Sequence, residues 1–437
     1  MDTEDDWSTS IRIFPTLKKN CYTIPVDKAG QRILVIKQTS PTFELQFDGN
    51  YWATVNKPNI VSYEAIYIAK QNTSSICLAR VEDDQIPFIS ALEIRSLHFN
   101  MYSHVNPNYA LLFVNRIYGG ANQTLRYPND AYDRIWEPES GFGSIIVSVK
   151  RNGGSIDTSG AQDNPPASVF RNALTNSGTY WGIVPTTRGL QDDKNVPIYI
   201  TTYFSEVDKT VKRSVQVLID DKHHQHLLAV AYITNTTASS NTNFSVQAAD
   251  DSSIPPLINS YEVYSIAGPL AQGTKTKDVE GLTALQRGFD VLEKWSGDPC
   301  LPSSFAWEWV QCNADPAPRV TSLNIKTSRN LGSFGLSGTL PDFSSMDPLQ
   351  TIDLNNNSLD GAIPDFLGSI SNLKLLDLSD NRLNGSIPSS LSDNKNLKLV
   401  LCKRKLSLGN VLFAGFLTRI QFIHPLQQTR SSVASYR

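Results

Sequence analysis

Residues 295–312 read WSGDPCLPSSFAWEWVQC and separate two different sequence textures. Before this stretch lie runs with the alternation typical of β-strands, and after it lies a leucine repeat of fixed period. Cys300 and Cys312 flank Trp307 and Trp309, so a disulfide between the two cysteines could close a small loop over the open end of a stacked array, which needs such a cap. We interpret the stretch as hinge and cap between two binding modules. The alternative is a solvent-facing loop with two free thiols.

The bulk composition is that of an ordinary globular chain of about two to four domains. The chain has 437 residues, of which 40% are hydrophobic and 19% charged. A net charge of -3 argues against nucleic acid as the main partner, which would require a basic face. Five cysteines are too few for a dense disulfide framework, and their odd number leaves at least one thiol unpaired.

The N-terminus, MDTEDDW, is acidic and lacks the basic start and apolar core of a secretory signal. No run reaches the roughly 18 apolar residues of a membrane span. We therefore expect neither an export signal nor a span in this sequence. Six Asn-X-Ser/Thr sequons nevertheless permit N-glycosylation on a secretory route; they lie at Asn72, Asn122, Asn235, Asn243, Asn356 and Asn384.

Residues 1–300 are rich in short strand-like runs separated by Asn, Gly, Pro and Asp clusters, which predicts a β-sandwich class. An internal repeat is visible. Residues 87–97 match 256–266 at an offset of 169, and residues 43–48 match 215–220 at an offset of 172. Ile33 matches Ile198, which would leave the first copy about seven residues short before its next strand. Two copies of one β domain are therefore expected.

A leucine-rich repeat follows the tryptophan stretch. The pattern that begins at Leu349 recurs at Leu373, with every element shifted by 24 residues. Leu and Ile should fill the solenoid core, and Asn357 and Asn381 should hydrogen-bond backbone groups of the turns. Side chains between the core positions should form the concave face; they are Thr351, Asp353, Asn355, Leu375, Asp377 and Ser379.

The repeat stops near residue 402. No acidic residue occurs from 401 to 437, and no polar capping unit follows. We interpret 403–437 as a basic, non-repeat tail.

Several segments together carry a family signature. The chain resembles the malectin-like ectodomain of plant leucine-rich-repeat receptor-like kinases over roughly residues 10–402. The matching segments are 19–25 (KNCYTIP), 42–49 (TFELQFDG), 87–93 (PFISALE), 125–136 (LRYPNDAYDRIW), 254–264 (IPPLINSYEVY) and the Gly-Asp-Pro-Cys motif at 297–300.

The resemblance implies a mostly β fold of two tandem malectin-like sandwiches and a short leucine-rich-repeat solenoid. We expect the first sandwich at 1–125, the second at 126–290, the junction and repeat cap at 291–318, the repeats at 319–402 and the tail at 403–437. The resemblance also implies an extracellular or plasma-membrane-associated protein that senses an oligosaccharide or cell-wall glycan. The family normally continues into a membrane span and a kinase, and we expect neither within these 437 residues.

Sugar binding needs aromatic faces for stacking and planar polar groups for hydroxyls. The segment between the two copies offers both kinds of group, in Tyr118, Tyr127, Asp130, Tyr132, Asp133, Arg134 and Trp136. The alternative is that these residues pack the interface between the sandwiches. A second function hypothesis is a protein-interaction module, in which the leucine-rich repeats dock a receptor kinase or peptide as co-receptor or decoy and sugar binding is vestigial.

Other chemistry receives less support. Residues 220–226 (DDKHHQH) contain suitable metal ligands, but they lie between two strand-like runs and are interpreted as a polar hairpin turn. We expect no metal and no cofactor. A glycosidase would need a carboxylate pair that nothing in the sequence singles out, and no nucleophile elbow, phosphate loop or kinase signature is present. We expect a protein that is not an enzyme.

Overall fold

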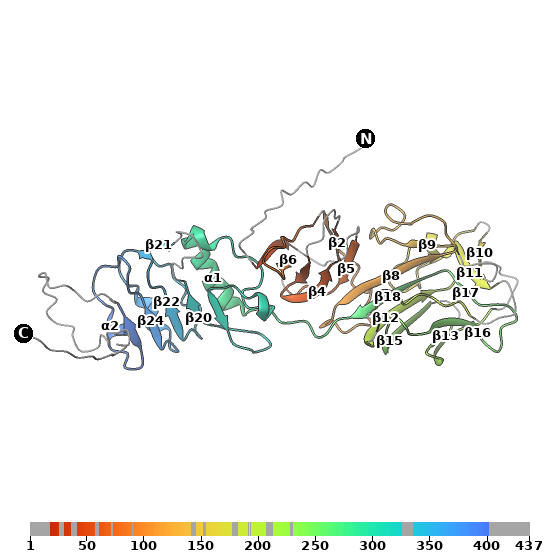
Figure 1. The fold of residues 1–437 in the computed structure, drawn as a ribbon. Coiled ribbons are helices and arrows are strands. Elements are labelled where there is room, and N and C mark those ends of the chain that lie inside the picture. The colour runs from red at the N-terminus through yellow and green to blue at the C-terminus, as the bar shows by residue number, and fades with distance from the viewer. Residues whose placement is uncertain are drawn as a thin grey trace, which may run out of the picture.

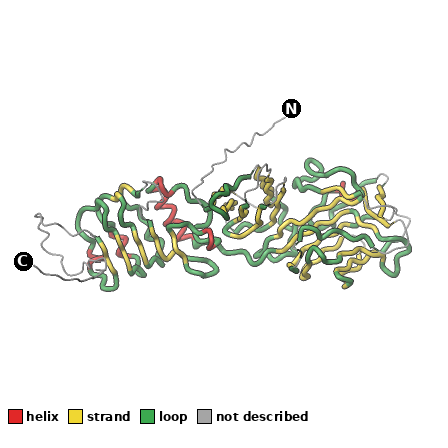
Figure 2. Tube along the Cα trace, in the orientation of Figure 1, coloured by secondary structure: helices red, strands yellow, loops and turns green. Residues whose placement is uncertain are grey.

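The computed structural model describes residues 18–25, 30–35, 42–56, 61–70, 73–89, 91–140, 146–151, 154–176, 182–190, 192, 194–206, 213–227, 230–325 and 335–401. The molecule is elongated, with three parts in a row (Figure 1). A first β unit (β1–β7) lies in the middle, a second β unit (β10–β18) lies on one side of it, and a leucine-rich block (β19–β25) lies on the other. Strands predominate throughout, and the longest helix lies beside the leucine-rich block (Figure 2).

The first unit contains a four-stranded antiparallel sheet in the order β1-β6-β3-β4. Its strands are β1 (Lys19–Pro25), β6 (Thr73–Arg80), β3 (Phe43–Phe47) and β4 (Asn50–Val55). The alternation predicted from the sequence holds in β3, where Phe43, Leu45 and Phe47 are fully buried in the core. Asp48 and Gly49 join β3 to β4 with φ of 45° and 75°, as a two-residue hairpin turn requires.

An eight-stranded sheet runs through both units in the order β15-β12-β18-β8-β5-β2-β7, with β9 beside β8. The strands are β15 (Val230–Ala238), β12 (Val196–Tyr203), β18 (Ser260–Ile266), β8 (Leu111–Gly119), β5 (Val61–Ile66), β2 (Gly30–Val35), β7 (Ala91–Arg95) and β9 (Glu137–Glu139). The start of β8 pairs with β5, and its whole length pairs with β18. One continuous sheet therefore connects two separate apolar cores.

The second unit adds a sheet β14-β13-β16 and a small sheet β10-β11-β17. Their bounds are β14 (Lys222–Leu227), β13 (Val215–Ile219), β16 (Phe244–Ala248), β10 (Ile146–Lys150), β11 (Asn172–Asn176) and β17 (Leu257–Ile258), and a short helix η1 (Ala167–Phe170) precedes β11. Val215, Val217 and Ile219 face the core against Ile198 and Ile200 of the long sheet. The mostly β fold class is confirmed.

The same pairing order occurs in both units. β3 lies between β4 and β6, as β13 lies between β14 and β16, and β2 lies between β5 and β7, as β12 lies between β15 and β18. The hairpin turn at Asp220 and Asp221 also repeats the positive φ values of the turn between β3 and β4. This order of strands is the pattern that a duplicated β domain would produce.

The register corrects one detail of the sequence comparison. Ile33 pairs with Leu92, and Thr202 pairs with Tyr261. Leu92 and Tyr261 are themselves equivalent at the offset of 169, so Ile33 corresponds to Thr202 and not to Ile198. Since the following strands match at 172, the register gives a difference of three residues between the two units at this point, and not the seven predicted.

The leucine-rich block has one sheet in the order β19-β20-β22-β24-β25, antiparallel in its first pair and parallel thereafter. Its strands are β19 (Val310–Cys312), β20 (Val320–Asn324), β22 (Thr351–Asp353), β24 (Leu375–Asp377) and β25 (Lys398–Val400), with β21 (Ser337–Gly338) paired to β23 (Ser358–Leu359). The helices are α1 (Thr276–Gly288), η2 (Asp290–Leu292), η3 (Ser303–Phe305), η4 (Asp365–Ser369) and α2 (Ser389–Ser392). Ile352 and Leu376 stand in register in the solenoid core.

The repeat asparagines bond the turns as expected. The Asn381 amide donates to the carbonyl oxygens of Leu354 and Leu378 at 2.9 and 3.0 Å, and its Oδ1 accepts the Leu359 N–H at 3.0 Å. Asn357 repeats this pattern one turn earlier. The tail predicted at 403–437 lies outside the described residues.

Candidate ligand-binding site

The segment predicted to bind sugar lies where the two β units meet, and most of its side chains point inward. Of the seven residues, Tyr118, Asp130, Asp133, Arg134 and Trp136 are buried, Tyr132 is half-buried, and Tyr127 is 67% exposed.

Asp130 organises this segment from within. Its carboxylate accepts hydrogen bonds from the Tyr132 N–H, the Arg134 guanidinium and the Trp136 indole, each at 2.8 Å. Trp136 is fully buried in an apolar cluster with Leu125, Phe170 and Tyr203, and Asp130 satisfies its indole N–H there. The side chains of Asp130, Arg134 and Trp136 therefore stabilise the fold of the segment.

Asp133 lies nearer the surface and has a backbone φ of 51°. Its carboxylate accepts from the guanidinium of Arg126 at 2.7 Å and that of Arg95 at 3.2 Å, and from the Tyr127 N–H at 3.0 Å. Since Arg95 ends β7 of the first unit, Asp133 ties the segment to that unit. Tyr127 alone of the seven presents most of its ring to solvent.

Beneath the segment lies a buried charge network centred on Arg116 of β8. The Arg116 guanidinium donates to Glu262 of β18 at 2.5 Å and to Glu64 of β5 at 2.6 Å. Burial alone would raise the pKa of Glu262, but Arg116 and Arg134 outweigh that effect and lower it. Glu262 is therefore ionised, and the network links strands of both units.

A shell of tyrosines completes the network. The hydroxyls of Tyr203, Tyr102 and Tyr264 donate to Glu262 at 2.9, 3.1 and 3.2 Å. Asp163 accepts from the backbone N–H of Tyr102 at 2.5 Å, and burial together with nearby Glu262 raises the pKa of the Asp163 carboxyl. These polar groups are occupied by internal partners, so a ligand would be held by other groups at the rim.

A cavity of about 310 Å³ opens directly above Tyr102. Its floor is formed by Met101, Tyr102 and Leu111, which belong to the same apolar cluster as the predicted Tyr132. Its rim carries Phe99, which is 76% exposed. None of the seven predicted residues lines this cavity, and the predicted segment meets its floor through Tyr132, which packs against this cluster.

The sequence reasoning missed these lining residues, which include Leu97, His98, Phe99, Ser103, Asn106 and Tyr109. His98 lies against Phe99 with ring centroids 4.5 Å apart. The available signal was the run 98–109, HFNMYSHVNPNY, which is dense in aromatic and amide side chains.

A second cavity of about 200 Å³ lies between the first unit and the junction, with Asp48, Lys70 and Asp298 among its lining residues. Tyr67 and Ile68 line both cavities, and Ile68 is 60% exposed. The two hollows therefore adjoin along one side of the first unit.

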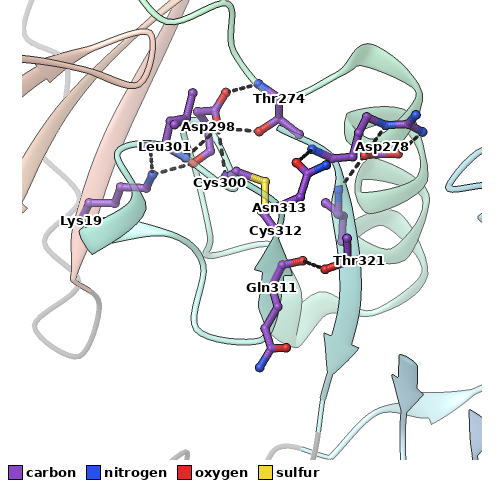
Figure 3. Close-up of a disulfide and its surroundings, with 12 residues drawn as sticks. Lys19, Thr274, Asp278, Asp298, Cys300, Leu301, Gln311, Cys312, Asn313 and Thr321 are labelled. Atoms are coloured by element: carbon purple, nitrogen blue, oxygen red, sulfur yellow. Dashed lines mark hydrogen bonds and ion pairs between the residues drawn. A yellow bond between two sulfur atoms is a disulfide. The ribbon is translucent and has the colours of Figure 1, made fainter. Parts of the chain in front are cut away.

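The junction itself is shown in Figure 3. Cys300 and Cys312 form a disulfide, which ties the loop to β19. The side chains of Trp295, Trp307 and Trp309 are buried in the core of the leucine-rich block. A second disulfide joins Cys21 to Cys77 within the first unit, and the sequence reasoning did not find it.

The residues predicted on the concave face divide into two kinds. Asp353 and Asp377 are buried, and the Asp377 carboxylate accepts the backbone N–H of Ser379, which is also buried, at 3.0 Å. Thr351 and Asn355 are half-buried. The two aspartates therefore hold their own turns, as short polar side chains commonly do after a strand.

The asparagines of five sequons, Asn122, Asn235, Asn243, Asn356 and Asn384, are exposed, and Asn72 lies outside the described residues. The side chains of 223–226 lie outside the part that the structure describes. Among the described side chains, no cluster of three or more metal-ligating groups occurs. Within the same residues, no helix has the length and apolarity of a membrane span.

Comparisons with known proteins agree with this architecture. The model of the malectin-like domain matches residues 2–266, and that of the leucine-rich repeat matches residues 348–370 and 372–394. A "Probable LRR receptor-like serine/threonine-protein kinase" of Arabidopsis thaliana is 32% identical over 379 residues, covering 78% of this chain and 42% of the relative. An uncharacterised protein of the same plant is 32% identical over 293 residues, covering 61% and 57%. The chain thus spans less than two thirds of either relative.

Two solved structures are also similar at low identity. One is the complex of the plant peptide RALF23 with FER and LLG2, with 12% identity, a TM-score of 0.48, and coverage of 57% of this chain and 81% of the matched chain. The other is the ANX2 ectodomain of Arabidopsis thaliana, with 16% identity, a TM-score of 0.47, and coverage of 57% and 82%.

Proposed function

Because this chain belongs to the malectin-like domain family, we propose that it is a ligand-binding ectodomain of the receptor-like-kinase type, which holds a cell-wall oligosaccharide without reacting with it. In this proposal β1–β7 and β10–β18 are two copies of one malectin-like sandwich, placed at 1–125 and 126–290. The junction at 291–318 and the repeats at 319–402 follow them. The protein acts outside the cell or at the plasma membrane, with glycans on its exposed sequons.

The observation that carries the proposal is the cavity above Tyr102, with Phe99 on its rim. Sugars present CH-rich faces that pack on aromatic rings, and an exposed ring beside a cavity offers such a surface. His98, Ser103 and Asn106 supply polar groups for hydroxyls at the same opening. Tyr127 offers a further exposed ring in the predicted segment.

In this proposal the buried residues of that segment hold the cavity floor in position. Arg134 donates to the Tyr102 hydroxyl at 3.2 Å, and Tyr102 forms part of the cavity floor. A fixed floor lowers the ordering cost of binding, because the site is already shaped before the ligand arrives.

The test is a glycan array followed by calorimetry on the whole chain. Phe99→Ala should weaken binding of the oligosaccharide found on the array about tenfold, which corresponds to about 1.4 kcal/mol. Ile86→Ala is the matched control, since Ile86 is an exposed apolar side chain that lines neither of the two cavities. Absence of binding to every cell-wall oligosaccharide would contradict the proposal, and release of reducing sugar would favour a glycosidase.

A second candidate function is protein interaction through the leucine-rich block. Ser322, Thr351, Leu375 and Lys398 stand in register across four neighbouring strands, and Leu375 and Lys398 are not buried. Such a row could dock a receptor-kinase ectodomain or a peptide, with this chain as co-receptor or decoy. Leu375→Asp should then abolish capture of purified receptor-kinase ectodomains by surface plasmon resonance and leave glycan binding unchanged.

A further inference from the structure

Part of the outer face of the four-stranded sheet in the first unit is covered, whereas Thr23 and Tyr51 on the same face are exposed. Register places Lys19 opposite Ala79 and Cys21 opposite Cys77, while Gln46 stands beside Cys77. These positions alternate with the inward Phe43, Leu45 and Phe47. Lys19, Cys77, Ala79 and Gln46 are nevertheless at most 6% exposed. An antiparallel sheet covered on both faces has a second packing partner.

The loop 296–301 of the junction supplies contacts on this face, as Figure 3 shows for Lys19. The Lys19 ammonium donates to the carbonyl oxygens of Asp298 at 2.5 Å and of Leu301 at 2.8 Å. The Cys21 N–H donates to the Ser296 hydroxyl at 3.0 Å. A buried ammonium thus connects the first strand of the chain with a loop almost 280 residues later.

The fit between loop and sheet is close. A Cβ added to Gly297 would lie 2.3 Å from the Cys21 sulfur and 2.7 Å from the Cys77 sulfur, and the residue has φ of +74°. On the other side, a Cβ added to Gly49 would meet the Leu301 side chain at 2.7 Å. Only glycine at 297 allows the loop to lie directly on the disulfide.

Hydrogen bonds within the junction also fix the conformation of the loop. The Asp298 carboxylate accepts the Thr274 hydroxyl at 2.6 Å and the backbone N–H groups of Thr274, Cys300 and Leu301 at 2.7, 2.9 and 2.9 Å. The disulfide from Cys300 to Cys312 then fixes the loop to β19. The Gly-Asp-Pro-Cys motif therefore presents a preformed surface that is continuous with the leucine-rich block.

We propose that residues 296–301 form a docking plug for the outer face of the first sheet, so that the first unit and the leucine-rich block are one rigid body. The surface formed by Lys19 and the disulfide from Cys21 to Cys77 has this loop of the same chain as its partner. Residues 295–312 are then a fixed joint and not a hinge. The inference involves no ligand and is independent of the proposed function.

The test compares two glycine variants of the whole chain. Gly297→Val forces a β-carbon against the Cys21 and Cys77 sulfurs, whereas Gly338→Val has the same kind of positive φ, +93°, and no atom within 4 Å of the added β-carbon. Hydrogen exchange at the Cys21 amide should be at least tenfold faster in Gly297→Val than in Gly338→Val. Small-angle scattering should show a larger radius of gyration for Gly297→Val alone.

Equal exchange and equal scattering for the two glycine variants would overturn the proposal. If Gly297→Val does not fold, Lys19→Met provides the decisive measurement, because it keeps the side-chain stem and removes the three ammonium donors. Lys19→Met should then show the faster exchange at Cys21. Exchange at the wild-type rate in Lys19→Met would overturn the proposal in that case.

Discussion

Lys19 of the first unit and Glu262 of the second are both buried, but they have different kinds of partner. Glu262 is bonded to a guanidinium and three tyrosine hydroxyls, whereas Lys19 donates to backbone carbonyls. A buried charge that loses its partner is far more costly than an exposed one. For Glu262 we therefore predict how much stability is lost when its charge is removed. For Lys19 we predict how stability changes with pH.

Glu262→Gln should lower the free energy of unfolding by about 3–5 kcal/mol, because it leaves the buried Arg116 without its charged partner on β18. Urea denaturation measures this change. Glu137→Gln alters an exposed carboxylate and should stay within about 0.5 kcal/mol of wild type. Equal stability of the two variants would show that the network does not hold the units together.

Lys19 makes stability depend on pH in the alkaline range. Burial lowers the pKa of its ammonium from 10.5 to about 8, although Asp298 opposes the shift. Between these two values the unfolded chain binds more protons than the folded chain, so the free energy of unfolding should rise with pH. From pH 7 to 11 the rise should be about 3 kcal/mol larger in wild type than in Lys19→Met, measured by denaturant titration at each pH. A parallel pH dependence would contradict the burial of this charge.

At the scale of elements, the leucine-rich block was the most predictable part of the chain. A solenoid repeats one set of contacts, so a shift of 24 residues in the sequence directly identifies Ile352 and Leu376 as equivalent core positions. The strands of the β units were predictable from alternation in the same way. The cavity above Tyr102 was not, because it lies between a strand end and the loop 97–109, and nothing local indicates which loop will cover which strand.

The asparagine ladder yields a prediction at this scale. Asn381→Ala removes the donors to Leu354 and Leu378 and the acceptor for Leu359, so buried backbone groups lose their partners. The leucine-rich block should lose about 2 kcal/mol or more of stability. Asn372→Ala is the control, since Asn372 is exposed and makes a single hydrogen bond to the Asp347 carbonyl. Thermal unfolding distinguishes the two, and equal melting temperatures would contradict the role of the ladder.

At the scale of the whole molecule, the sequence indicated the order of the parts but not their contacts. The predicted binding segment does lie between the units, yet Asp130 and Trp136 turned out to be buried, since junctions bury aromatic side chains more often than they expose them. The covered outer face of the first sheet was equally hidden from sequence reasoning. Gln46 and Ala79 occupy positions that alternation assigns to solvent, yet both are fully buried.

The two disulfides should differ in their contribution to stability. Cys21 and Cys77 are 56 residues apart, and Cys300 and Cys312 are 12 apart. Because a longer closed loop restricts the unfolded chain more, replacing the first pair by serine should cost about 4 kcal/mol and replacing the second about 3 kcal/mol. Calorimetry of the two double variants measures the difference. A larger loss for the shorter loop would assign most of the effect to packing around the tryptophans.

Strand β8 belongs to both β units, since it pairs with β5 at its start and with β18 along its length. Any change in β8 must therefore suit two neighbourhoods at once, and a shift of one residue would invert its side chains for both. Neither unit can therefore be excised or exchanged by itself, because removing β8 with one unit would leave an unpaired sheet edge on the other.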